Sequence, residues 1–155
     1  MKEIAILYDG GVVDKKIIED FERKLGVRFP YRYKELLSHH NEIYLEEPFF
    51  KFINLDNLYD SRDVTFWGYG DQIDKSSRVE LNQDHDVYGH DLVVAIGCAA
   101  NGDYICFDYR DSPETESPSI VVMFHDAYDE SNKMIICHVA DSFEQFIDML
   151  YKYDG

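Results

Sequence analysis

Apolar residues in the first 41 positions of the chain follow the spacing of two amphipathic helices. The first helix places four apolar side chains on one face: Ile17, Ile18, Phe21 and Leu25. Asp14 is a suitable N-cap for this helix, and Gly26 suits the left-handed residue that ends it. Pro30 is tolerated in the first turn of the second helix, which we expect to stop at Asn41.

From residue 49 onward the pattern changes to short apolar runs between turn residues, which is typical of strands. These runs cover six ranges: 49–53, 64–67, 92–96, 104–109, 119–124 and 134–139. Asn101-Gly102 stands before the fourth run and is a strong signal for a tight hairpin. The spacing of the later runs predicts an antiparallel meander. A closing helix begins at Ser142, whose hydroxyl can pair with Gln145 in a capping box.

Together these elements predict an α+β protein with one domain over residues 1–155. We expect a mostly antiparallel sheet of about five or six strands, packed with two N-terminal helices and one C-terminal helix. The polar stretch 68–91 interrupts the strand pattern. A loop of that length in a compact domain is usually functional or partly mobile.

Charge adds information about partners. The chain holds 31 acidic and 15 basic residues, a net charge of −16, and residues 42–117 alone hold 17 acidic and five basic residues. Nucleic-acid binding depends on Lys and Arg that neutralise phosphates, so direct binding to nucleic acid is disfavoured. Attraction to an anionic membrane surface is disfavoured for the same reason. A partner protein with a basic surface fits this charge better.

The apolar runs and the cysteines indicate a cytoplasmic protein. No run approaches the ~20 apolar residues that a transmembrane helix requires. The N-terminal apolar run is too short for a signal peptide and is flanked by acidic residues. Cys98, Cys106 and Cys137 are odd in number and stand in apolar runs, so we expect buried free thiols.

Motifs for catalysis or cofactor binding are absent from the sequence. It contains no phosphate-binding loop, dinucleotide fingerprint, nucleophile elbow or zinc-binding helix motif. Cys137 and His138 are adjacent strand residues and therefore point to opposite faces. The stretch 85–91 offers His85, Asp86, His90 and Asp91 for a mixed nitrogen and oxygen metal site. Such a cluster in a polar loop is usually solvated. We therefore expect no catalytic residue, no cofactor and no metal.

Several segments resemble the SUKH superfamily. Its opening motif is similar to Ile18-x-x-Phe21-Glu22-x-x-Leu25-Gly26-x-x-Phe29-Pro30-x-x-Tyr33-Lys34-x-x-Leu37. The ranges 96–108, 121–125 and 139–146 resemble the central hairpin, the closing strand and the closing helix of the superfamily. One departure is the acidic segment 41–47, which stands where the family often has a Gly-rich stretch.

The superfamily includes a fungal regulator of cell-wall synthesis and a large set of bacterial immunity proteins. The resemblance therefore implies a non-catalytic protein that neutralises a polymorphic toxin, commonly a nuclease, by masking its active site. A regulatory or scaffold protein of the same fold is the alternative, because a fold does not determine a function. A metalloprotein or enzyme that uses the 85–91 cluster is a third reading.

Acidic residues of the middle segment, together with two aromatic side chains, form the predicted interface with the toxin. Trp67 and Tyr69 are the predicted anchors, because large aromatic residues often carry most of the binding energy. Core packing is the competing interpretation for Trp67. The acidic members of the predicted interface are Glu46, Glu47, Asp56, Asp60, Asp63, Asp71 and Asp74.

Overall fold

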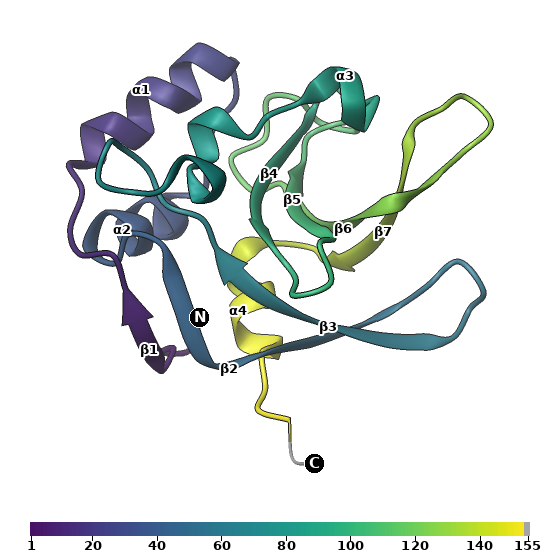
Figure 1. Ribbon diagram of the computed structural model, residues 1–155, viewed down its shortest axis with the longest axis horizontal. Coiled ribbons are helices and arrows are strands. Elements are labelled where there is room, and N and C mark those ends of the chain that lie inside the picture. The colour runs from purple at the N-terminus through teal and green to yellow at the C-terminus, as the bar shows by residue number, and fades with distance from the viewer. Residues whose placement is uncertain (154–155) are drawn as a thin grey trace.

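A computed structural model, which describes residues 1–153, shows one seven-stranded sheet with helices packed on it (Figure 1). The strands are β1 (Ile6–Asp9), β2 (Ile43–Ile53), β3 (Tyr59–Phe66), β4 (Val93–Cys98), β5 (Tyr104–Asp108), β6 (Ser119–Tyr128) and β7 (Met134–Ala140). The helices are α1 (Lys15–Leu25), α2 (Tyr31–His39), α3 (His85–Tyr88) and α4 (Phe143–Met149). Asp154 and Gly155, the last two residues of the predicted domain, lie outside the described residues.

The sheet is an antiparallel meander in which every strand pairs with its neighbour in the chain. This confirms the predicted α+β class, but the sheet has seven strands where five or six were expected. The additional strand is β1, a strand of four residues, three of which pair with the start of β2. Its half-buried and exposed residues give a weak sequence pattern, which explains why periodicity missed it.

The residues predicted to cap the first and the last helix do so in the structure. The Asp14 carboxylate accepts a hydrogen bond from Lys16 N (3.0 Å), and Gly26 adopts a left-handed conformation with φ of 74°. At the start of α4, Ser142 Oγ accepts a hydrogen bond from Gln145 N (3.1 Å), while Asp141 N donates to Gln145 Oε1 (2.5 Å). Local capping therefore fixes both the first and the last helix of the chain.

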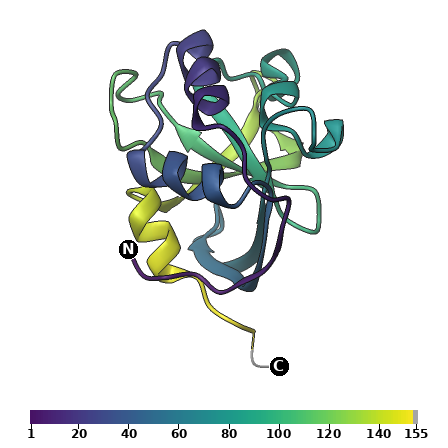
Figure 2. The ribbon, with the colours of Figure 1, turned by 90° about the vertical axis from the view of Figure 1, so that its left-hand side faces the viewer.

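An aromatic core fills the space between the sheet and two of the helices. Figure 2 shows α2 and α4 next to each other, and Tyr33 of α2 and Phe143 of α4 both contact Phe107 of β5. The ring of Tyr33 on α2 makes edge contacts with Phe29, Phe107 and Phe143, at centroid distances of 5.5, 4.9 and 5.5 Å. These contacts join α2, β5 and α4.

The stretch 68–91 is a structured cover for the sheet. It contains two 3₁₀ turns, η1 (Lys75–Ser77) and η2 (Val79–Leu81), and the short α3. The amide of Gln83 bonds to both the N–H and the carbonyl of Ala95 on β4, at 3.0 and 2.7 Å. Val79 and Tyr88 are buried. The expected long loop is therefore packed on β4 and β5, where its ordered turns form part of the core.

The middle of the sheet is narrow. Strands β3 and β4 pair over only two residue pairs, Thr65 with Cys98 and Phe66 with Gly97. A Cβ atom at Gly97 would lie 2.4 Å from the carbonyl oxygen of Thr65, so the two strands approach as closely as they do because Gly97 has no side chain. The close backbone approach expected at Gly97 is confirmed. Beyond this junction the outer parts of β2 and β3 continue as a separate two-stranded hairpin.

Candidate protein-binding surface

Two hairpins project from the same side of the sheet (Figure 1). We call residues 51–61 the β2–β3 arm and residues 124–134 the β6–β7 arm. In the β2–β3 arm, Phe52 is paired with Asp60 and Ile53 with Tyr59. Because paired residues of antiparallel strands point to the same face, Phe52 and Asp60 share the inner face of the arm, while Ile53 and Tyr59 share the outer face.

The tip of the β2–β3 arm exposes four large apolar side chains. Ile53, Leu55, Leu58 and Tyr59 are 51, 66, 63 and 81% exposed. Asn54 fixes the turn between them, since its Oδ1 accepts hydrogen bonds from Asp56 N (3.0 Å) and Leu58 N (3.1 Å). The tip is therefore a shaped apolar projection with the exposed Asp56 within it.

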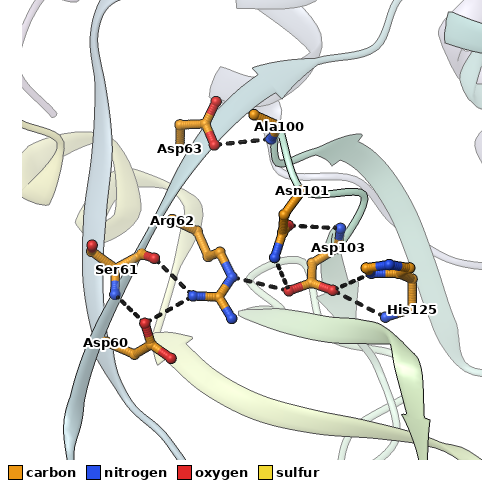
Figure 3. A network of polar contacts seen from close by, with 8 residues as sticks. All are labelled: Asp60, Ser61, Arg62, Asp63, Ala100, Asn101, Asp103 and His125. Atoms are coloured by element: carbon orange, nitrogen blue, oxygen red, sulfur yellow. Dashed lines mark hydrogen bonds and ion pairs between the residues drawn. The ribbon is translucent and has the colours of Figure 1, made fainter.

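A network of polar contacts fixes the base of the arm (Figure 3). Arg62 Nε donates to the Asp103 carboxylate (2.9 Å), and its Nη1 donates to Asp60 (2.8 Å). The guanidinium also lies 5.5 Å from the ring centroid of Phe52 and 5.7 Å from that of Phe124. Arg62 thus joins the inner face of the β2–β3 arm to β6.

Asp103 is the centre of this network and is only 1% exposed. Its carboxylate accepts hydrogen bonds from His125 Nδ1 (2.6 Å), from His125 N (3.1 Å) and from Asn101 Nδ2 (3.0 Å). Burial by itself raises the pKa of Asp103, but the bonds from His125, Arg62 and Asn101 outweigh it, so the pKa lies below its usual value. Asp103 is therefore an ionised, fully bonded carboxylate that ties three strands together.

The same carboxylate takes part in the one group of metal-binding residue types that residues 1–153 bring together, namely Asp103, His125 and Asp126. These residues fit a metal poorly. The Arg62 guanidinium already neutralises Asp103, and the Nδ1–H of His125 donates to the same carboxylate. The arrangement stabilises the fold through ion pairing, and two of its three members, Asp103 and the Nδ1 of His125, are engaged with each other.

The 85–91 cluster does not converge on a single point. Its members are spread along α3 and the following loop, and His90 Nε2 donates to the carbonyl of Met134 (2.8 Å). Cys106 and Cys137 are buried free thiols and Cys98 is half-buried. Burial raises the pKa of the Cys106 thiol, which keeps it protonated and unreactive.

Trp67 and Tyr69, the predicted anchors, are core residues, and for Trp67 this is the competing interpretation that the sequence left open. They are 5% and 0% exposed. Trp67 packs against Tyr104 at a centroid distance of 6.1 Å, and the hydroxyl of Tyr69 bonds to that of Tyr33 at 2.7 Å. Asn41 also bonds to both the N–H and the carbonyl of Tyr69, which holds the backbone inside the fold. Neither ring is available to a partner in this structure.

The seven predicted acidic residues do not form one patch. Glu46 and Glu47 are exposed near the C-terminal segment, and Asp56 is at the arm tip. Asp71 and Asp74 are exposed in the segment that follows Tyr69, which runs beside α1 on the side opposite the arm tip (Figure 1). Asp60 bonds to Arg62, and Asp63 accepts a hydrogen bond from the N–H of Ala100 at 2.9 Å. Three of the exposed carboxylates have weaker contacts: Glu47 lies 4.0 Å from Lys2, Asp71 lies 3.6 Å from Arg78, and Asp74 accepts a hydrogen bond from Ser76 N at 3.3 Å.

Sequence reasoning missed the apolar residues of the arm tip. The available signal was the run Ile53-Asn54-Leu55-Asp56-Asn57-Leu58-Tyr59, in which two Asn residues and an Asp mark a turn while four large apolar residues remain. Apolar side chains in a tight surface turn have no core to enter. They are therefore candidates for contact with another molecule.

Comparison with known proteins gives one finding. A family model described as the SMI1 / KNR4 family (SUKH-1) matches residues 13–149, which span the elements from α1 to α4. No curated protein matches the chain. Within residues 1–153, no helix has both the length and the apolar character needed to cross a membrane.

Proposed function

Because the chain belongs to the SMI1 / KNR4 family (SUKH-1), we propose that it is an immunity protein that binds a cognate polymorphic toxin and masks its active site. The toxin is a basic nuclease, and neutralisation takes place in the cytoplasm. The observation that carries the proposal is the β2–β3 arm, a fixed hairpin with an exposed apolar tip. Such a surface suits a protein partner and offers no catalytic group.

The charge of the chain supports a basic partner. A net charge of −16 attracts a cationic protein over several ångströms and raises its association rate. The same negative charge repels nucleic acid, so the immunity protein would bind the toxin and not the nucleic acid that the toxin cleaves. Of the predicted acidic residues, Glu46, Glu47, Asp56, Asp71 and Asp74 are exposed. We assign to these five the role of steering the toxin.

A second function is regulation through a different protein partner. The matched family is named after SMI1 and KNR4, and the superfamily includes a regulator of cell-wall synthesis. The arm would then bind a cellular protein in place of a toxin. The surface and its chemistry would be the same, so the identity of the partner separates the two functions.

The decisive experiment is co-purification with the product of the neighbouring gene, followed by an inhibition assay. We expect a stable complex and loss of the toxin's nuclease activity at a one-to-one molar ratio. A neighbouring gene for a secreted protein with a C-terminal toxin domain would favour immunity. Undiminished nuclease activity in the presence of excess protein would contradict the proposal.

Reversing the five exposed charges should slow association. In a variant with Lys at positions 46, 47, 56, 71 and 74, we expect the association rate constant with the toxin to fall at least about tenfold at low ionic strength. The difference should shrink as salt screens the charges. Stopped-flow or surface-based kinetics over a salt series measures both effects.

The matched control carries the same change in net charge at other exposed acidic positions. These are Asp20, Asp86, Asp91, Asp111 and Glu114. If the control slows association as much as the test variant does, only the total charge matters and the five positions have no special role. If neither variant changes the rate, steering by charge is wrong.

A further inference from the structure

We infer that the tip of the β2–β3 arm is the anchor of the interface, and that it enters an apolar recess of the toxin whose rim carries Lys and Arg. The inference deepens the proposed function and rests on it. It assigns the anchoring role to Leu55, Leu58 and Tyr59, in place of the buried Trp67 and Tyr69.

The first argument is the density of exposed apolar side chains. Four large apolar residues lie within seven consecutive positions at the end of a projecting hairpin. Singly exposed apolar residues are common on protein surfaces, but a contiguous exposed cluster marks a site of association. A convex tip of this kind requires a concave partner. Tyr59 adds a ring with a polar end, a residue type that is enriched at binding hot spots.

The second argument is rigidity. Asn57 adopts a left-handed conformation with φ of 60°, and its N–H donates to the carbonyl of Asn54 (3.0 Å). The turn is therefore closed by backbone and side-chain bonds before any partner arrives. At the base, Arg62 and Asp103 hold the arm against β6. A surface that is already ordered loses little conformational entropy on binding, which favours tight association.

The third argument is charge, which selects among possible occupants. The two arms, Arg62, Asp63 and Asp103 together hold seven carboxylates and three cationic side chains, a net charge of −4. A second copy of this chain would bring the same negative charge to the contact, and an anionic membrane would be repelled as well. A recess with a cationic rim complements both the apolar tip and the carboxylate of Asp56 within it.

The test uses the toxin domain encoded by the neighbouring gene, in a catalytically inactive form, and the full-length immunity protein. In the variant Leu55→Ser/Leu58→Ser/Tyr59→Ser we expect the Kd to rise at least about 100-fold. The substituted side chains are exposed, so the urea midpoint of unfolding should stay unchanged, which separates lost contact from lost folding.

A matched control replaces three exposed apolar residues on other elements, in the variant Leu7→Ser/Val12→Ser/Leu81→Ser. Its Kd should stay within about threefold of the wild-type value. If the tip variant bound the toxin with the wild-type Kd, or if only the control variant lost binding, the inference would be overturned and the proposed function would stand. Absence of binding and neutralisation by the wild-type protein would overturn the proposed function itself.

The basic rim has its own readout. Asp56→Lys places a cation at the centre of the tip, so we expect about tenfold weaker binding at low ionic strength and a smaller loss at high salt. An unchanged or improved affinity would show that the rim is not cationic. The tip variant and Asp56→Lys thus examine the apolar and the charged parts of the recess separately.

Discussion

Replacing Asp103 with Ala is expected to lower the free energy of unfolding by about 3–5 kcal/mol, because it removes the centre of a buried ionic network. Arg62 would lose one of its two carboxylate partners and keep Asp60, and both the ring and the backbone N–H of His125 would lose their acceptor. The cost arises mainly from donors left without an acceptor in a poorly solvated site. Urea unfolding followed by circular dichroism measures the change.

Asp126→Ala is the matched control for this substitution. Asp126 follows His125 directly and is exposed, so its removal should change the free energy of unfolding by less than about 0.5 kcal/mol. A loss below about 1 kcal/mol in Asp103→Ala would mean that the network contributes little to stability. The arm would then need another explanation for its fixed position.

The same network predicts a dependence of stability on pH. The pKa of Asp103 in the folded protein lies below its ordinary value of 3.8, so folding favours the ionised form. Its contribution to stability is fully present above the ordinary pKa and is lost as the pH falls through the folded-state pKa. The difference in unfolding free energy between the wild-type protein and Asp103→Ala should therefore shrink in acid, which urea unfolding over a pH series would show.

Replacing Tyr33 with Ala in the wild-type protein is expected to lower the free energy of unfolding by about 3–5 kcal/mol through loss of core packing. The ring is fully buried and contacts Phe29, Phe107 and Phe143. Removing it opens a cavity where α2, β5 and α4 meet. Equilibrium unfolding in urea is the appropriate measurement, since the slope of the transition also reports any change in compactness.

Tyr33→Phe separates the ring from the hydroxyl. It keeps the packing and removes only the 2.7 Å hydrogen bond to Tyr69, so we expect a loss of about 1 kcal/mol. Equal losses in the Phe and Ala variants would show that the hydroxyl pair, and not the packed ring, stabilises this part of the core.

Local signals in the sequence predicted most of the fold. Asp14, Gly26 and Ser142 each act through their own backbone neighbourhood, so their roles are readable without knowing the rest of the molecule. The Asn101-Gly102 turn likewise depends on conformational preference alone: Gly102 has φ of 99°. The six predicted strands correspond to β2 through β7 because each contains an apolar run that is long enough to be recognised as a strand in the sequence.

The site was harder to predict because exposure is a property of the whole fold. Trp67 and Tyr69 stand beside a polar stretch, which suggests a surface position. They are buried because that stretch folds back over β4 and β5, and because Asn41, distant in the chain, binds the backbone of Tyr69. Similarly, the arm becomes a separate projection only because β3 and β4 separate after two residue pairs. Such tertiary contacts leave no local trace in the sequence.

The cover formed by residues 68–91 gives the protein an internal spectroscopic reporter. Trp67 is the only tryptophan of the chain, and it lies against Tyr104, which in turn contacts Tyr88 of the cover. A buried indole emits at shorter wavelengths than a hydrated one, so opening of the cover would shift the intrinsic fluorescence to the red. The arm tip contains no indole, and contact made there would leave this emission unchanged. Intrinsic fluorescence can therefore distinguish opening of the cover from binding at the tip of the β2–β3 arm.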